Sequence, residues 1–130
     1  MIATGICLLV GSQLRAHLPA DDFSLAWQHS VARTRWEEHY QLDHGKLVLV
    51  EASVAGTGAG MEPAPEATYA AGRWRWRPAT APLSELRLTY SRFTQDYELC
   101  WARRCSKLGA LIHPRSKTEV VSVQACEPKQ

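Results

Sequence analysis

The sequence has no uninterrupted apolar run of about 18 residues, which is the length that a membrane-spanning helix requires. Its formal net charge of +2 is small, whereas nucleic-acid-binding domains usually concentrate basic charge on one face. No internal repeat is present. We therefore expect a chain that, as given, does not span a membrane, does not bind nucleic acid and is not a repeat protein.

Amphipathic helical periodicity is also missing, whereas short stretches of alternating apolar and polar residues recur between turn residues. This pattern predicts an all-β protein, an antiparallel sandwich or barrel of about nine to ten short strands. The length of 130 residues suits one domain with one ordinary core. We predict a single domain over residues 1–126 and a flexible tail over residues 127–130.

The N-terminal segment is apolar from Ile2 to Val10 but has neither a basic stretch before it nor a clear signal-peptidase site after it. We interpret residues 5–10 and 13–18 as a first β-hairpin that turns at Gly11–Ser12. The chain as given then corresponds to a mature protein whose export signal is missing or lies upstream.

The four cysteines allow three disulfide pairings. Cys100 and Cys105 flank the sequence WARR, which favours a tight hairpin that brings them together. This leaves Cys7 and Cys126, which would join the first strand to the last. Because disulfides persist in oxidising compartments, we predict a periplasmic or otherwise extracytoplasmic location. Four reduced, buried thiols are the alternative.

The stretch from Phe23 to Tyr40 reads as two strands joined by a short turn. Alternation places His29 on the apolar face of the first strand and Glu38 on the apolar face of the second. With a turn near residues 32–33, position 29 lies opposite Trp36 and one diagonal step from Glu38. Diagonal neighbours are about 7–8 Å apart, within reach of long side chains.

A carboxylate on an apolar face needs a partner or a raised pKa, and a protonated imidazole is a suitable partner. The His29–Glu38 pair is therefore either a ligand- or cation-binding pocket or a structural hydrogen bond that fixes strand register. Glu37 and Asp96 are further candidates for such a pocket. One histidine and one glutamate are too few for zinc, and we predict no metal and no cofactor.

A glycine- and proline-rich segment follows from Gly56 to Ala67. It lacks the lysine of a phosphate-binding loop and a following helix, so a P-loop is excluded. Thr57 would join the ligand site if this segment folds over the central hairpin. A connecting loop without a ligand is the alternative.

Residues 73–77, RWRWR, alternate strictly, with Trp74 and Trp76 on one face and three arginines on the other. Such a strand either binds an acidic partner, nucleic acid or anionic lipid, or packs its tryptophans inward and exposes its arginines to solvent.

His29, Ser30 and Glu38 supply the residue types of a hydrolase triad. However, Ser30 neighbours His29 on the opposite strand face, and the sequence has no G-x-S-x-G nucleophile motif. We therefore predict that the protein is not an enzyme.

The segments FSLAWQHSV, TRWEEHY, GTGAGMEP and SRFTQDYELC, followed by the cysteine-bearing tail, lie within residues 23–126. Together they resemble the bacterial family called domain of unknown function eighteen-fifty. His29, Glu37, Glu38 and Asp96 lie in these segments, but the family offers no functional residues to carry over.

The resemblance implies a small exported protein encoded beside transporters of the TRAP type (tripartite, periplasmic-binding-protein-dependent) and their TAXI-type solute receptors. We therefore expect an accessory module whose partner is a transporter membrane subunit or a solute receptor. A β-domain that binds a small-molecule ligand or a cation through His29 and Glu38 is the alternative.

Overall fold

The structure is a computed structural model that describes residues 5–28, 34–55 and 65–126. It confirms the all-β prediction, with eleven strands and one short helix in the described residues. In chain order the elements are β1 (Gly5–Val10), β2 (Gln13–Leu18), β3 (Asp22–Gln28), β4 (Arg35–Asp43), β5 (Lys46–Ala55), β6 (Thr68–Ala70), β7 (Arg73–Trp76), β8 (Leu86–Ser91), β9 (Glu98–Trp101), β10 (Arg104–Lys107), α1 (Leu108–Ile112) and β11 (Thr118–Cys126). With five residues, the helix is too short to cross a membrane, and the described residues form no other helix.

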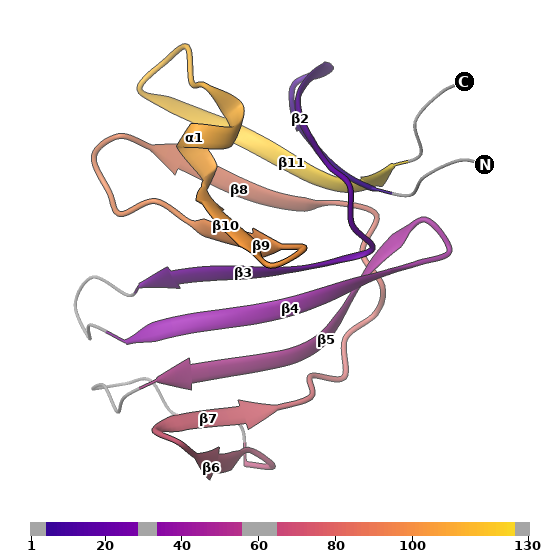
Figure 1. Cartoon of the computed structure of the whole chain (residues 1–130), viewed down its shortest axis with the longest axis vertical. Coiled ribbons are helices and arrows are strands. Elements are labelled where there is room, and N and C mark those ends of the chain that lie inside the picture. The colour runs from indigo at the N-terminus through magenta and orange to yellow at the C-terminus, as the bar shows by residue number, and fades with distance from the viewer. Residues whose placement is uncertain (1–4, 29–33, 56–64, 127–130) are drawn as a thin grey trace.

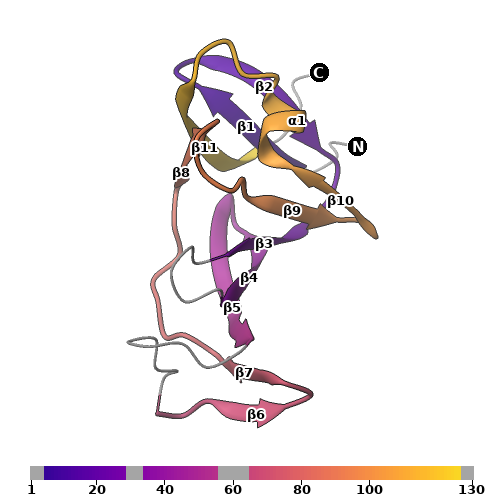
Figure 2. The same ribbon diagram turned by 90° about the vertical axis from the view of Figure 1, so that its left-hand side faces the viewer.

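The strands form two antiparallel sheets (Figure 1). One has four strands in the order β2-β1-β11-β8, and the other has seven in the order β10-β9-β3-β4-β5-β7-β6. Seen from the side, the four-stranded sheet and α1 lie at one end of the molecule, and β7 and β6 lie at the other end (Figure 2). The seven-stranded sheet therefore extends well beyond the sheet that packs on it.

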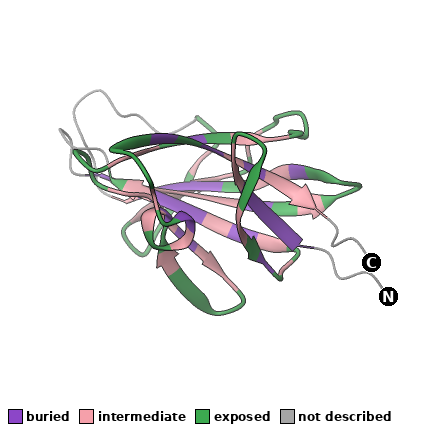
Figure 3. Ribbon diagram, turned by 90° about the horizontal axis from the view of Figure 1, so that it is seen from above, coloured by how far each residue is buried: buried purple, intermediate pink, exposed green. Residues whose placement is uncertain are grey.

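The core lies between the two sheets and beneath α1. It combines residues of the four-stranded sheet, such as Leu8 and Val121, with residues of the seven-stranded sheet, such as Phe23 and Leu99. Figure 3 shows these buried stretches along the strands, with exposed residues at the turns. No described residue of β6 or β7 belongs to the buried cluster. The far end of the larger sheet thus relies on its own side chains for packing.

Three hairpins close through two-residue turns in which both residues have positive φ: His44–Gly45, Ala71–Gly72 and Ala102–Arg103. This geometry matches the right-handed twist of the strands that the turns connect. Glycine adopts it without strain, but Ala102 and Arg103 each pay a steric cost of about 1–2 kcal/mol. The third turn is the one that the Cys100–Cys105 disulfide holds closed.

Both predicted disulfides are confirmed, and Cys7–Cys126 joins β1 to β11. The Cα atoms of Cys7 and Cys126 are 5.8 Å apart, and the two residues are separated by 119 positions in the sequence. Closing a loop of this length contributes about 4–5 kcal/mol in the chain-entropy description. Two disulfides are typical of proteins in oxidising compartments.

The predicted register of the central hairpin is wrong by two residues. Trp36 pairs with Trp27 rather than with position 29, and Glu38 pairs with Leu25. The β4–β5 register also shifts between His39 and Tyr40, because His39 pairs with Glu51 and Tyr40 pairs with Leu49, which leaves Val50 as the extra residue of a bulge in β5. The turn that sets this register falls in residues 29–33, outside the described residues, as do the glycine-rich segment over residues 56–64 and the predicted tail over residues 127–130.

Candidate functional site

Glu38 lies in β4 on the face of the seven-stranded sheet that turns toward the core. Its cross-strand neighbours are Leu25 and Ala52, which are both buried, and the next residue across the sheet is Trp76. The Tyr40 hydroxyl donates a hydrogen bond of 2.7 Å to Glu38 Oε1. The carboxylate is therefore set on an apolar surface, as the alternation of β4 predicts.

Two tyrosines near the Glu38 carboxylate have raised pKa values. Burial raises the pKa of Tyr40 far above its ordinary value, and the hydrogen bond to Glu38 raises it further. Burial also raises the pKa of Tyr97, and the charges of Glu38 and Asp96 add to that shift. Both phenols stay protonated at neutral pH and remain available as hydrogen-bond donors.

A line of aromatic side chains crosses the same face beside Glu38. Trp27 and Trp36 stack with ring centroids 6.3 Å apart, and Trp36 meets Trp76 edge-on at 6.0 Å. Tyr97 packs edge-on against Trp27 at 6.2 Å, and Tyr69 packs on Trp74 at 5.0 Å. We call this set the aromatic row; its members are Tyr97, Trp27, Trp36, Trp76, Trp74 and Tyr69.

The register explains the row. Trp27, Trp36, Val54, Trp74 and Tyr69 pair in succession across β3, β4, β5, β7 and β6. The tryptophans are only partly buried, and Tyr69 is 59% exposed at the edge of the sheet. The sequence prediction that Trp74 and Trp76 share a face away from the arginines is thus confirmed.

Three polar atoms on this face are shielded from solvent and have no hydrogen-bond partner among the described residues: Thr34 Oγ1, Trp36 Nε1 and Trp74 Nε1. Thr34 is 2% exposed and precedes Trp36 by two residues. An unpaired buried polar group costs about 1–3 kcal/mol. Each atom is therefore a polar group whose burial is not compensated by a hydrogen bond among the described residues.

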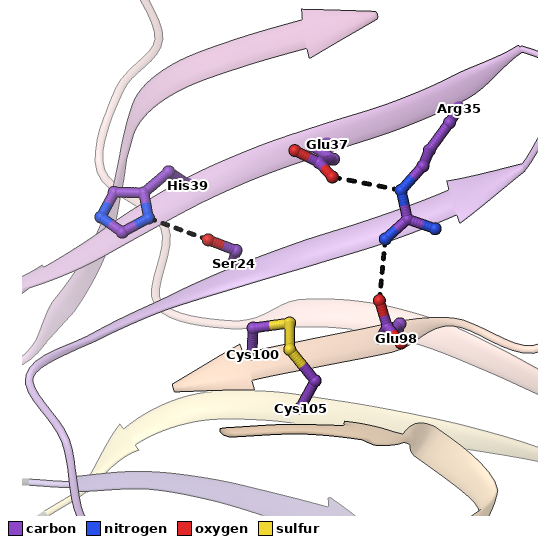
Figure 4. Close-up of a disulfide and its surroundings, with 7 residues drawn as sticks. All are labelled: Ser24, Arg35, Glu37, His39, Glu98, Cys100 and Cys105. Carbon is purple, nitrogen blue, oxygen red and sulfur yellow. Dashed lines mark hydrogen bonds and ion pairs between the residues drawn. A yellow bond between two sulfur atoms is a disulfide. The ribbon is translucent and has the colours of Figure 1, made fainter. Parts of the chain in front are cut away.

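The opposite, outer face of the sheet carries paired charges. Arg35 bonds Glu98 at 2.8 Å and Glu37 at 3.1 Å, and Arg73 contacts Glu37 at 3.3 Å. Figure 4 shows Arg35 between the two carboxylates, next to the Cys100–Cys105 disulfide. The hydrogen bond to Glu98 is the main cause that raises the pKa of Arg35. Glu37, a predicted ligand residue, thus pairs with two arginines on the face away from Glu38.

His39 also lies on the outer face, between two polar side chains. Its Nε2 is 3.2 Å from Asp22 Oδ2, and its Nδ1 is 3.1 Å from Ser24 Oγ. A groove of about 530 Å³ beside it is lined by residues that include Gln41 and Arg77. These are the residue types of a hydrolase triad, and sequence reasoning missed them. The correct register, with Ser24 directly opposite His39, is the signal that would have found them.

The family described as Domain of unknown function (DUF1850) matches residues 23–108. The chain belongs to this family. Comparisons with curated proteins and with solved structures found no match. The DUF1850 match covers nearly the whole seven-stranded sheet together with β8, and it includes Glu38 and the aromatic row. Strands β1, β2 and β11, with the Cys7–Cys126 disulfide, lie outside it.

Within the DUF1850 region, Asp96 bonds to the backbone. Its carboxylate accepts hydrogen bonds from Tyr97 N at 2.9 Å and from Gly109 N at 2.7 Å. These bonds tie the segment before β9 to α1. Asp96 therefore supports the loop that holds Tyr97 in the aromatic row.

The other two predicted ligand residues, His29 and Thr57, lie outside the described residues, so the His29–Glu38 pair stays a prediction. Two groups of potential metal ligands occur in the described part of the DUF1850 chain: Cys7, His17 and Cys126, and Glu98, Cys100 and Cys105. Both depend on sulfurs that are bonded to each other. Neither group can bind a metal through thiolates while the disulfides are intact.

Proposed function

We propose that this DUF1850 protein is a non-enzymatic, extracytoplasmic binding module of a TRAP-type solute transport system. The two disulfides support an oxidising location, and the family resemblance supports the association with a transporter membrane subunit or a solute receptor. The observation that carries the proposal is one end of the aromatic row, because Trp36, Trp76, Trp74 and Tyr69 lie outside the core cluster, whereas Trp27 and Tyr97 pack against it. Exposed aromatic patches on a rigid scaffold are typical of binding surfaces.

The test is recovery of the tagged protein from membranes of its native host. Wild type is expected to retain transport components, and a deletion strain is expected to take up the transported solute more slowly. Tyr69→Ala removes an exposed ring of the row and is expected to weaken retention. Phe93→Ala is the matched control, because Phe93 is a 70% exposed aromatic residue in the turn after β8. Recovery of no transport component, with unchanged uptake, would overturn the proposal.

The non-enzymatic part of the proposal concerns Asp22, His39 and Ser24. The side chains of His39 and Asp22 are 34% and 47% exposed on the outer face, whereas a catalytic aspartate is buried where it orients its histidine. The three groups fit a cross-strand polar cluster that fixes the β3–β4 register. A serine-directed fluorophosphonate probe is expected not to label Ser24. Labelling that disappears in His39→Ala would contradict this assignment.

A second candidate function is a small-ligand site on the inner face around Glu38. The Glu38 carboxylate favours it, since it lies on an apolar face and receives a single hydrogen bond, from Tyr40, among the described residues. Glu38→Ala and His29→Ala are expected to weaken ligand binding, and Glu37→Ala on the outer face is the control. Equal binding by all three variants and wild type would remove this candidate.

A further inference from the structure

An open cavity lies where the connection after β8 meets the connection between α1 and β11. Its volume is about 500 Å³, and the residues that line it include Tyr90, Arg92, Arg115 and Lys117. The backbone N–H of Arg92 donates a hydrogen bond of 3.0 Å to the Lys117 carbonyl, which joins the two connections. Both lie at the same end of the four-stranded sheet (Figure 1). We call this cavity the basic pocket.

Three cationic side chains line the basic pocket, and all three are exposed to solvent. Among the described residues, none of Arg92, Arg115 and Lys117 forms an ion pair with a carboxylate. The Arg92 guanidinium lies 5.8 Å from the centroid of the Phe93 ring, a contact that positions the cation without neutralising its charge. Because like charges repel, an anion placed among these three groups is stabilised by all of them.

The carboxylate that lies next to these residues in the chain, Glu119, is already paired. Its Oε1 is 3.2 Å from Arg15 Nη1, and the two side chains are only 6% and 10% exposed. Its Oε2 accepts hydrogen bonds from the backbone N–H of Arg115 at 3.2 Å and from Ser116 Oγ at 3.4 Å. Glu119 therefore fixes the loop that carries two of the cations, while Arg15 balances its charge. The positive charge of the pocket stays uncompensated among the described residues.

Tyr90 forms one wall of the basic pocket, and α1 holds that wall in place. Gly109 lies so close to the ring that a Cβ atom there would be 2.8 Å from Tyr90 Cε1. Asp96 does not line the pocket, and its carboxylate accepts a hydrogen bond of 2.7 Å from Gly109 N instead. One side of the pocket is thus closed by a fixed aromatic ring, which excludes water there and strengthens the charge interactions inside.

The donors of the pocket indicate which anion fits. Guanidinium groups match the oxygens of a carboxylate or a phosphate, and a lysine ammonium adds a point charge. A carboxylate has two oxygens in one plane, whereas a phosphate monoester has three terminal oxygens and a charge of about −1.5 to −2 at neutral pH. Three cations around one cavity match the second group better. A volume of about 500 Å³ also lies in the usual range for small-molecule sites.

We propose that the basic pocket binds a phosphate monoester group, whose terminal oxygens pair with the guanidinium groups of Arg92 and Arg115 and with the Lys117 ammonium. A soluble phosphate ester and a lipid headgroup share this chemistry, and the test below separates the two sources. A nucleic-acid backbone would need basic residues along a whole face, whereas these three are confined to one pocket. The proposal goes beyond the transporter module and does not depend on it.

The test follows the backbone amide signals of residues 115–117 by ¹H–¹⁵N NMR on the full chain with its disulfides intact. The soluble probes are sodium phosphate, glycerol 3-phosphate and sodium succinate, each added separately at one ionic strength set with sodium chloride. We expect the two phosphates to cause saturable shifts and succinate to bind at least tenfold more weakly. Co-sedimentation with phosphatidylcholine vesicles, with and without phosphatidic acid, reports binding to a lipid headgroup.

Two variants and a matched control locate the binding. Arg115→Gln is expected to lower the affinity for glycerol 3-phosphate about tenfold, as the loss of one charged hydrogen bond predicts. The double substitution Arg115→Gln and Lys117→Gln is expected to abolish measurable binding. Arg104→Gln is the control, because Arg104 is an exposed arginine of β10 that forms no described ion pair and lies outside the pocket. It is expected to bind as wild type does.

Several results would overturn the proposal. Succinate that binds as tightly as glycerol 3-phosphate would reject the phosphate class. Equal losses in Arg104→Gln and Arg115→Gln would assign the binding to overall charge. No saturable shift with either phosphate, together with no sedimentation that depends on phosphatidic acid, would remove the site. Sedimentation that depends on phosphatidic acid and is lost in Arg115→Gln, without a response to soluble phosphates, would support the proposal with a lipid as the source. Recovery of transport components plays no part in these measurements, so the two proposals fail separately.

Discussion

The two faces of the seven-stranded sheet are built from the same strands but handle their polar groups in opposite ways. On the outer face, Arg35, Arg73 and Arg75 each have a carboxylate partner. On the inner face, Trp36 and Trp74 keep shielded N–H groups without a partner among the described residues. Arg73 Nε on the outer face is likewise shielded and without a partner among the described residues, although another nitrogen of that guanidinium contacts Glu37. The faces therefore differ in kind: the outer one is held by ion pairs and the inner one by partly exposed aromatic rings.

The inner face is itself divided. Where β3, β4 and β9 face the four-stranded sheet, Phe23, Leu25 and Leu99 are almost fully buried. Toward β7 and β6, outside the buried cluster, this face is formed by partly exposed tryptophans. Fold stability therefore depends mainly on one part of this face, and the transporter proposal depends on the other.

The largest expected contrast between the faces is in stability. Trp36→Ala removes a ring that contacts both Trp27 and Trp76, and we expect the free energy of unfolding to fall by about 3 kcal/mol. Arg35→Ala, one residue away on the outer face, should cost less than about 1 kcal/mol, because its ion pairs are partly exposed. Urea denaturation measures both, and equal losses would contradict the distinction.

A smaller effect is expected from the Tyr40 hydroxyl. Tyr40→Phe removes the donor to the Glu38 carboxylate, and we expect a loss of about 1.5 kcal/mol at neutral pH, since hydrogen bonds to charged groups are stronger than average. Tyr69→Phe is the control, because Tyr69 lies exposed at the sheet edge. The same urea experiment applies, and a Tyr40→Phe variant as stable as wild type would show that this bond contributes nothing.

The pH dependence should follow the raised pKa values of Tyr40 and Tyr97. A tyrosine in the unfolded chain titrates near pH 10. The folding stability that comes from protonated Tyr40 and Tyr97 is therefore fully present below about pH 10, and it is lost as the pH rises toward their folded-state pKa values. In Glu38→Gln both pKa values should move down, toward the ordinary value. Absorbance titration of tyrosinate reports this directly, and unchanged titration curves in Glu38→Gln would place the cause elsewhere.

The smallest effect is expected on the outer face. Because Arg73 and Arg75 are paired with Glu37 and Glu51, wild type should elute from heparin at low salt. The double substitution Glu37→Gln and Glu51→Gln frees both arginines and should delay elution slightly. Strong, salt-dependent retention of wild type would instead favour the nucleic-acid interpretation of the RWRWR strand.

Alternation and turn chemistry were enough to predict much of the sheet. Strict period-two patterns placed Glu38 and Trp74 on the correct face, and the short WARR hairpin identified the Cys100–Cys105 pair. Register was not predictable in the same way, because a strand pair slipped by two residues keeps every side chain on its face. Pairing two aromatic residues, Trp27 with Trp36, was the cue that would have corrected it.

Features that depend on three-dimensional packing lay beyond sequence reasoning. The backbone bonds of Asp96 to Tyr97 and Gly109 join residues whose contact no periodicity encodes. The bulge at Val50 appears only in the pairing of β5 with β4, and no pattern within either strand predicts it. The extent of the larger sheet beyond the smaller one is set by which strands pair, and not by the pattern of any single strand.

The Cys7–Cys126 bond closes the chain between these two residues, which are 119 apart in sequence, into a covalent ring. A protease that cuts any single peptide bond inside this ring opens it without releasing a fragment. The cleaved protein would migrate as one species on a gel until a reductant separated the two pieces. Nicking of an exposed connection could thus pass unnoticed in an oxidising environment, with both sheets still tethered to each other.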